Sequence, residues 1–313
     1  HRRHRGADLQ AGIALVVVQP IVRKRFGEFS YLHRPGEGEN QVTVHFAHAT
    51  GFNAETYREL FSMLDPSLDL YAMDARGHGL SEAPANPKLL KSWSQFRRDL
   101  RRFVEKLSTP MVLAGHSMGA TVSMELAAEL PDLAQGLVLI DPVITPPRHI
   151  PVLAVARSFG IEDRFISIAQ MAAKRRMEFP SKEAAVENYV GKGPFRTWPR
   201  AWIEAYVDGG TVPTSDGQVR LSCDRTWESR TFTKVTLNPY PAIERLRCPI
   251  TLIARDHAGP PFSLDSRDAF IERKPETRLL ILEEASHFMT MEHPEISRDE
   301  IERMAALARS ELG

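Results

Sequence analysis

The sequence predicts an α/β fold, in which a mostly parallel sheet of eight strands is flanked by helices. Three observations indicate this class. Short apolar runs alternate with stretches of helical periodicity along most of the 313 residues. Hydrophobic residues make up 42% of the chain, which is enough for a large buried core. The motif Gly-His-Ser-Met-Gly at 115–119 stands between an apolar run and a helix-like stretch, where a strand would turn into a helix.

The first half of the chain supplies most of the expected elements. Alternating Val42, Val44 and Phe46 are typical of a strand, and Phe96, Leu100 and Phe103 recur at helical spacing. Strands are expected at 14–18 with 22–26 as the first edge strand, and at 29–33, 41–48, 68–75, 111–114 and 136–142; helices are expected at 54–64, 92–107 and 120–130.

The regular alternation stops at about residue 146 and resumes after residue 241. Between these points the sequence has helical patterns, many prolines, three tryptophans and one short strand pattern at 218–223. Afterwards we expect strands at 249–254 and 278–282 and helices at 263–274 and 298–312. We therefore divide the chain into a first core part (1–145), a mainly helical insertion (146–241) and a second core part (242–313).

Composition excludes several classes of protein. Lys and Arg number 40, as do Asp and Glu, so no net charge favours nucleic acid or an anionic membrane as a partner. Two cysteines cannot form a disulfide framework or a cysteine metal site. No apolar run approaches the ~20 residues of a membrane span. We expect no metal, no cofactor and no nucleic-acid partner, and either a monomer or a homodimer.

The N-terminal residues superficially resemble an export signal. A basic stretch at 1–5 precedes an apolar run at 11–18, but Asp8 and Gln10 interrupt the pattern and no small-residue cleavage site follows. A cytoplasmic location is therefore favoured, with export as the alternative. The chain does not begin with Met, so the sequence leaves open whether residues precede it.

The motif at 115–119 has the features of a nucleophile on a sharp turn. A turn that lifts Ser117 out at the end of a buried strand crowds the residues two before and two after it, and both Gly115 and Gly119 lack a side chain. The helix that follows would point the backbone N–H of Met118 at the space above Ser117, where it would stabilise an oxyanion. This is half of an acyl-transfer site.

With its other motifs, the chain resembles the α/β-hydrolase superfamily, in the form that carries a helical cap after the sixth strand. The resemblance rests on 115–119, on Arg-Gly-His-Gly at 76–79, on Ala-Ser-His-Phe at 285–288 and on Glu-His-Pro-Glu at 292–295. It extends from about residue 46 to the C-terminus. It implies a chain order of nucleophile, acid and histidine, with 146–241 as the cap over the site.

The resemblance identifies a catalytic triad with one ambiguous member. Ser117 is the expected nucleophile, and His287, in a loop after the strand 278–282, is the expected base. Relatives usually place the acid in a Gly-x-x-Asp pattern after the seventh strand, but here Arg255 takes the Gly position and Ala258 the Asp position. Asp141, at the end of the sixth strand, is the preferred acid, and Asp256 is the alternative.

The second oxyanion donor is expected in the loop after the third strand. Relatives show His-Gly-X there, and His48-Ala49-Thr50 matches with Ala49 in place of Gly. Thr50 is therefore the preferred donor beside Met118, and Phe52 is the donor in the alternative register. We interpret His48 as a structural residue.

The cap is expected to set substrate choice through adaptable apolar surface. The candidate substrate-contacting residues are His116, Phe195, Trp198, Trp202 and Phe288. The basic run 174–176 is interpreted as a solvated face, with recognition of a substrate carboxylate as the alternative.

The resemblance thus implies a cofactor-independent serine hydrolase that acts on a carboxylic ester or lactone of a largely apolar small molecule. C–C bond hydrolysis, cofactor-free perhydrolysis and a ligand receptor without turnover are the alternatives on this fold.

Overall fold

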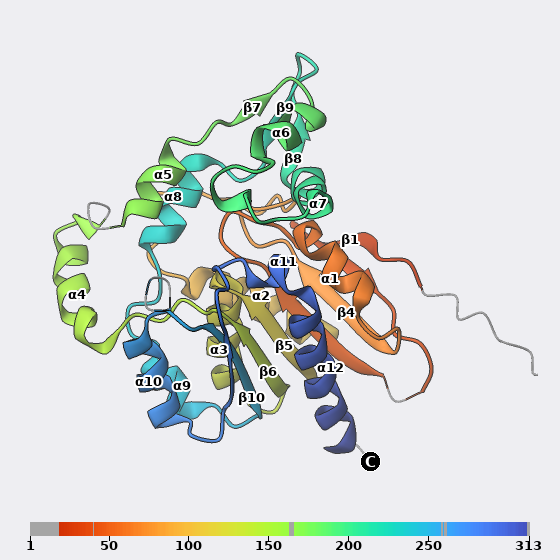
Figure 1. Cartoon of the computed structure of the whole chain (residues 1–313), viewed down its shortest axis with the longest axis vertical. Coiled ribbons are helices and arrows are strands. Elements are labelled where there is room, and N and C mark those ends of the chain that lie inside the picture. The colour runs from red at the N-terminus through yellow and green to blue at the C-terminus, as the bar shows by residue number, and fades with distance from the viewer. Residues whose placement is uncertain (1–18, 40, 163–165, 258, 260–261, 312–313) are drawn as a thin grey trace, which may run out of the picture.

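The computed structural model describes residues 19–39, 41–162, 166–257, 259 and 262–311. Its centre is an eight-stranded sheet in the order β1-β2-β4-β3-β5-β6-β10-β11 (Figure 1). The strands are β1 (Val22–Phe26), β2 (Phe29–Arg34), β3 (Val42–Ala47), β4 (Leu68–Met73), β5 (Met111–His116), β6 (Ala134–Ile140), β10 (Ile250–Arg255) and β11 (Arg278–Leu282). β2 is antiparallel to β1 and β4, and the pairings from β4 to β11 are parallel. The predicted sheet is confirmed, and the expected strand segment 14–18 lies outside the described residues.

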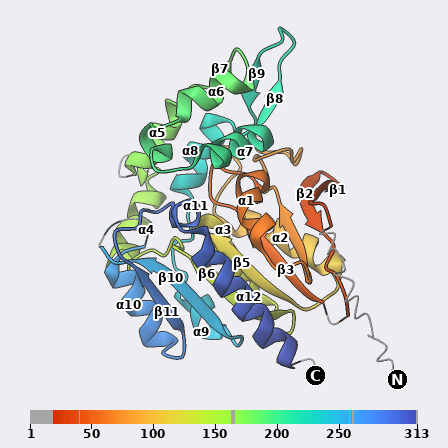
Figure 2. The same cartoon turned by 45° about the vertical axis from the view of Figure 1, so that its right-hand side comes forward.

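Helices cover both faces of the sheet (Figure 2). On one face lie α1 (Arg58–Met63) and α12 (Pro294–Glu311), and on the other lie α2 (Ser94–Leu107), α3 (Met118–Glu129), α9 (Tyr240–Arg245) and α10 (Leu264–Arg273). Side chains of a strand alternate between these two layers, so the buried Val112 and Leu113 of β5 belong to separate apolar clusters. The core is therefore two layers of apolar side chains with the sheet between them.

The helix α12 lies close to the centre of the sheet because β6 carries Gly136, where a Cβ atom would meet the sulfur of Met304 at 2.4 Å. The helix begins at Pro294, four residues before the expected start at 298. Proline is well suited to the first turn of a helix, where its missing N–H has no intrahelical partner.

The insertion after β6 starts next to α10 and then extends above the sheet, and several of its aromatic side chains belong to the same apolar cluster as one face of the sheet (Figure 1). It contains η2 (Pro147–His149), α4 (Ile150–Ser158), α5 (Ser167–Ala173), β7 (Glu178–Phe179), α6 (Lys182–Tyr189), η4 (Gly193–Phe195), α7 (Arg200–Gly210), β8 (Thr211–Pro213), β9 (Val219–Leu221) and α8 (Arg225–Thr233). β7, β9 and β8 form a small antiparallel sheet. β9 falls within the strand expected at 218–223. The two- and three-residue strands β7 and β8 are too short for a clear period-2 pattern.

Two indole groups attach α8 to the core below. Nε1 of Trp93, just before α2, donates to the carbonyl of Thr231 at 2.9 Å. Nε1 of Trp227, on α8, donates to the carbonyl of Arg76 at 3.1 Å. Both indoles are buried, so these bonds fix α8 over the end of the sheet. Within the described residues, no helix has the length and apolar character needed to cross a membrane.

Candidate active site

The turn between β5 and α3 places Ser117 in a strained backbone conformation. Ser117 has φ 56° and ψ −117°, a region that residues with a side chain rarely adopt. Its backbone N–H donates to the carbonyl of Ile140 at 2.9 Å, which ties the turn to the end of β6. A Cβ atom on Gly115 would meet the backbone of Gly119 at 2.5 Å, and one on Gly119 would meet the carbonyl of Ala47 at 2.0 Å. The spacing of the two glycines thus follows from close backbone contacts.

The structure brings Ser117, His287 and Asp141 together from three different loops. The Ser117 hydroxyl lies 3.0 Å from Nε2 of His287, and Nδ1 of His287 lies 2.6 Å from Oδ2 of Asp141. A carboxylate only accepts, so Nδ1 carries the proton and Nε2 is free to accept from the serine. Asp141 is fully buried, whereas Ser117 is 5% exposed. This is the geometry of a nucleophile, a general base and an orienting acid.

Of the two candidate acids, Asp141 contacts His287 and Asp256 does not. Oδ1 of Asp256 accepts from Nδ1 of His257 at 2.8 Å, on a partly exposed surface. That hydrogen bond to His257 is the main cause that holds the pKa of Asp256 below its ordinary value.

A second charged group contacts Asp141. Arg255, the last residue of β10, places its Nε 2.9 Å from the same Oδ2 that accepts from His287. The side chains of Arg255 and Asp141 are 7% and 0% exposed. The sequence showed Arg255 in place of the usual Gly, but sequence reasoning did not predict this contact.

The two expected oxyanion donors stand at the same edge of the sheet. Met118 is the first residue of α3, where backbone N–H groups have no intrahelical acceptor. The N–H of Phe52 donates to the carbonyl of Ala49 at 3.1 Å and is therefore occupied. The N–H of Thr50 has no hydrogen-bond partner in the described part of the chain. Of the two registers, the structure leaves the donor free at Thr50.

A buried chain of hydrogen bonds connects this oxyanion loop to the base. The N–H of Ala49 donates to the hydroxyl oxygen of Tyr57 at 3.2 Å, and that hydroxyl donates to Nδ1 of His116 at 2.8 Å. Nε2 of His116 donates to the backbone carbonyl of His287 at 2.7 Å. Burial, and second the nearby His287, hold the pKa of His116 well below its ordinary value, so the ring is neutral.

The structure differs from the expectation that His116 contacts the substrate. The ring is fully buried, and both of its nitrogens are engaged by Tyr57 and His287. Sequence reasoning missed this role because Tyr57 and His116 are 59 residues apart in the chain.

His48 has the structural role expected for it. Its Nδ1 donates to the carbonyl of Ala49 at 2.8 Å, and its Nε2 accepts from the N–H of Ala75 at 2.9 Å. Burial lowers the pKa of His48 to about 4, so it is neutral near pH 7 and can hold the loops after β3 and β4 together.

Aromatic side chains from the cap and the core meet above the site. The ring centroid of Trp198 lies 5.2 Å from that of Phe52 and 5.6 Å from that of Phe288, the residue after His287. Phe195 also packs against Trp198, with the two ring centroids 4.8 Å apart. Trp202 is buried in the same apolar cluster, but no aromatic ring contact involves it within the described ranges.

One member of the basic run 174–176 points into the cap. Nη1 of Arg175 lies 3.0 Å from both carboxylate oxygens of Glu228, and Nη2 contacts the hydroxyl of Tyr206. Glu228 in turn lies against the oxyanion loop, because a Cβ atom on Gly51 would meet its Oε1 at 2.2 Å. The prediction that the whole run faces solvent is therefore wrong for Arg175, whose charge is paired inside the protein.

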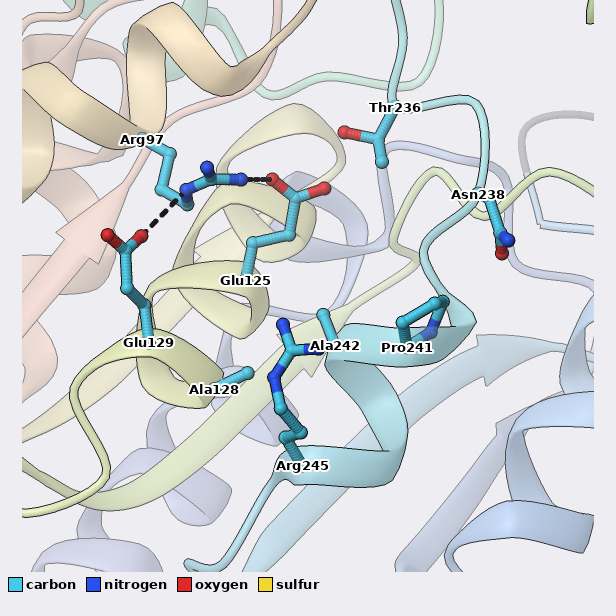
Figure 3. Close-up of a pocket in the computed structure, with 9 residues that line it drawn as sticks. All are labelled: Arg97, Glu125, Ala128, Glu129, Thr236, Asn238, Pro241, Ala242 and Arg245. Atoms are coloured by element: carbon cyan, nitrogen blue, oxygen red, sulfur yellow. Dashed lines mark hydrogen bonds and ion pairs between the residues drawn. The ribbon is translucent and has the colours of Figure 1, made fainter.

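A separate polar cavity of about 420 Å³ lies between α2, α3 and α9 (Figure 3). In it, Arg97 pairs with the carboxylates of Glu125 and Glu129. Glu125 belongs to the second half of α3, whereas Ser117 precedes the first residue of that helix. The cavity is thus distinct from the site at Ser117. Among the described residues no cluster of His, Cys, Asp and Glu has the arrangement of a metal site.

Comparison with known proteins places the chain among hydrolases. Residues 46–299 match the sequence model of the alpha/beta hydrolase family. The 2-(acetamidomethylene)succinate hydrolase of Mesorhizobium japonicum is 24% identical over 253 residues, which are 80% of this chain and 84% of that protein. The monoglyceride lipase of Mus musculus is 33% identical over 114 residues, which are 34% of this chain and 37% of the lipase.

Solved structures show the same fold. The structure of E-2-(acetamidomethylene)succinate hydrolase superposes with a TM-score of 0.71 at 21% identity, over 91% of this chain and 99% of that one. An esterase from Mycobacterium tuberculosis superposes with a TM-score of 0.67 at 22% identity, over 92% of this chain and 90% of that one.

Proposed function

The chain belongs to the alpha/beta hydrolase family, and we propose that it is a serine hydrolase that cleaves a carboxylic ester or a lactone through a covalent acyl-enzyme. One observation carries the proposal: the Ser117 hydroxyl lies 3.0 Å from Nε2 of His287, whose Nδ1 lies 2.6 Å from the buried Asp141. A hydroxyl with a base in reach, and a base oriented by a third group, is the arrangement of an activated nucleophile.

Each group has one role in the proposed reaction. Oγ of Ser117 attacks the carbonyl carbon while Nε2 of His287 takes the hydroxyl proton, and Asp141 stabilises the imidazolium that forms. The N–H groups of Met118 and Thr50 stabilise the oxyanion. His287 then gives the proton to the leaving alcohol, and a water activated by the same base hydrolyses the acyl-enzyme.

The cap supports a largely apolar substrate without a net charge. The rings of Phe52, Trp198 and Phe288 meet above the triad and offer apolar contacts. The side chain of Arg175 is 16% exposed, and its charge is already balanced by Glu228. A substrate carboxylate would have to displace Glu228 to reach it.

A second candidate is hydrolysis of an amide bond in an acid. The relative that matches 80% of this chain is named for such a compound, a 2-(acetamidomethylene)succinate. Recognition of its carboxylates would require a cation, and Arg175 is the candidate in the cap. The pairing of Arg175 with Glu228 favours the ester over this alternative.

A substrate panel with a covalent probe tests the proposal. The purified protein is assayed on p-nitrophenyl esters of increasing chain length, on lactones and on acylamino acids, and is treated with a fluorescent alkyl phosphonate. We expect ester or lactone turnover and phosphonate labelling, both abolished in Ser117→Ala. Labelling without turnover of any compound would indicate a receptor. Neither labelling nor turnover would show that the proposal is wrong.

A further inference from the structure

Arg255 stands beside the candidate triad acid because of the register between two strands. β6 and β10 are parallel neighbours in which Ile140 pairs with Ile253, and the N–H of Asp141 donates to the carbonyl of Ile253 at 2.8 Å. Side chains two residues apart on a strand share a face, so Arg255 projects on the same side of the sheet as Ile253. The acid follows the end of β6, and the arginine ends β10 next to it.

The pairing of Arg255 with Asp141 balances a buried negative charge that the neutral His287 cannot balance. A general base must be neutral before it takes the serine proton, so in the resting enzyme His287 offers Asp141 a hydrogen bond but no positive charge. Asp141 is fully buried, and burial of a carboxylate without a balancing charge is strongly unfavourable. Among the arginines and lysines of the described residues, Arg255 makes the ion-pair contact with Asp141.

The position of Arg255 is itself restrained. Its Nη2 donates to the carbonyl of Gly259 at 3.2 Å, and its Nη1 lies 3.4 Å from Nε2 of His257. The guanidinium thus contacts the loop that follows β10 while its Nε lies 2.9 Å from Oδ2 of Asp141. A planar group held at several points restricts the rotation of the carboxylate that it contacts.

We propose that Arg255 is a positioning residue of this site: it holds the Asp141 carboxylate toward Nδ1 of His287 and balances its charge while the imidazole is neutral. The inference rests on the proposed serine-hydrolase function. It concerns the orientation of the acid, so loss of Arg255 should slow the chemical step and leave substrate binding unchanged.

The test compares Arg255→Met, which removes the charge, with Arg255→Lys, which keeps it. We expect kcat to fall about 10- to 100-fold in Arg255→Met with KM within about twofold of wild type, by analogy with residues that orient metal-ligating histidines. Arg255→Lys should recover a substantial part of the loss because a point charge remains. Loss of less than half of kcat in a folded Arg255→Met protein, or a rise in KM alone, would overturn the proposal.

Arg97→Met is a matched control for the general cost of leaving a buried carboxylate without its paired arginine. Arg97 pairs at 3.0 Å with Glu125, whose side chain is 3% exposed, in the cavity away from Ser117 (Figure 3). This variant should be destabilised while its kcat stays at the wild-type value. An equal fall of kcat in Arg97→Met and Arg255→Met would assign both losses to stability and sink the proposal.

A double variant keeps the test informative where Arg255→Met does not fold. Asp141→Asn removes the charge that Arg255 balances, so Asp141→Asn with Arg255→Met should be no slower than Asp141→Asn alone. A further tenfold loss in the double variant would mean that Arg255 acts independently of the acid, which contradicts the proposal.

A spectroscopic measurement separates this inference from the proposed function. The proton between Nδ1 of His287 and Asp141 lies in a short charge-assisted hydrogen bond and should give a downfield NMR resonance that is absent from His287→Ala. Arg255→Met should shift or broaden this resonance, and Arg255→Lys should restore it. An unchanged resonance in Arg255→Met refutes the role of Arg255, whether or not the protein hydrolyses esters.

Discussion

The edge of the sheet around Ser117 and the cap above it are held together in different ways. At the edge, groups from four loops meet through hydrogen bonds, such as His287 to Asp141 at 2.6 Å and His116 to the carbonyl of His287 at 2.7 Å. Among the cap residues nearest the site, rings contact one another at 4.6–6.5 Å, and the ion pair of Arg175 with Glu228 adds direction. Directional bonds fix reacting atoms, whereas ring contacts can adapt to a ligand.

Strained backbone conformations occur at the edge of the sheet around Ser117. Within the described chain, the non-glycine residues with positive φ are Ser108, Ser117, Asp141 and Glu284. Ser117 and Asp141 are two of the three candidate triad residues. Such conformations cost about 1–3 kcal/mol each and persist where the surrounding structure holds them. The strained backbone at the edge of the sheet therefore lowers the stability of the fold while it fixes the candidate catalytic side chains, as is expected at an active site.

The largest effect is expected from the nucleophile. Ser117→Ala should leave the fold intact and reduce turnover by a factor of 10⁴ to 10⁶, as loss of a triad nucleophile does. Ser117→Gly should be equally inactive but about 1 kcal/mol more stable than Ser117→Ala, because glycine tolerates φ 56°. Thermal unfolding and ester turnover measure both effects. More than a tenth of wild-type activity in Ser117→Ala would remove Ser117 from the reaction.

The next largest effect distinguishes the two candidate acids. Asp141→Asn should lower turnover by up to ~10⁴, because the amide no longer stabilises the imidazolium and permits the wrong tautomer of His287. Asp256→Asn should change turnover by less than about twofold, since Asp256 bonds to the partly exposed His257. Both variants are assayed side by side. Loss of activity in Asp256→Asn alone would reverse the assignment.

The sequence predicts the candidate catalytic residues at the edge of the sheet better than it predicts the contacts within the cap. Close backbone contacts make Gly115 and Gly119 necessary, so the turn around Ser117 leaves a local signature. His287 and Asp141 each follow a strand whose apolar run can be recognised in the sequence. The contacts of the cap leave no such signature, because Arg175 reaches Glu228 across 53 residues and a basic run usually faces water.

Some contacts at the edge were also beyond sequence reasoning. Arg255 was noticed as a departure from the family pattern, but its contact with Asp141 depends on the register of β6 and β10. The link from Tyr57 to His116 likewise requires β3 and β5 to be neighbours. Residue types at strand ends can be read from a sequence, whereas partners across strands require the topology.

A smaller loss of activity is expected when the hydrogen-bond link between the oxyanion loop and the base is broken. Tyr57→Phe keeps the ring but leaves the N–H of Ala49 and Nδ1 of His116 without their partner. Unpaired buried groups cost about 1–3 kcal/mol each, and the loops at Thr50 and His287 can then shift. We expect kcat to fall about tenfold with little change in KM.

Tyr31→Phe is the matched control for Tyr57→Phe. Its ring stacks on Tyr71 at 6.2 Å, in a contact that does not involve the candidate site. This variant should keep wild-type kcat. If Tyr57→Phe also keeps it, the hydrogen-bond chain contributes to folding but not to the reaction.

The smallest change in rate, and the largest change in substrate preference, is expected in the cap. Trp198 touches Phe52 and Phe288, which border the oxyanion loop and the base, whereas Trp202 is buried in the same apolar cluster without a ring contact in the described structure. Replacement of either indole by alanine removes a similar volume and should cost about 3–5 kcal/mol of stability. The cavity left by Trp198 would adjoin the rings of Phe52 and Phe288. Trp198→Ala should therefore shift the preferred p-nitrophenyl ester toward longer acyl chains, while Trp202→Ala keeps the wild-type order and both still react with a small phosphonate. If the two variants shift the chain-length preference equally, the cap affects substrate choice through its overall stability. The ring contacts of Trp198 would then have no special role in acyl-chain preference.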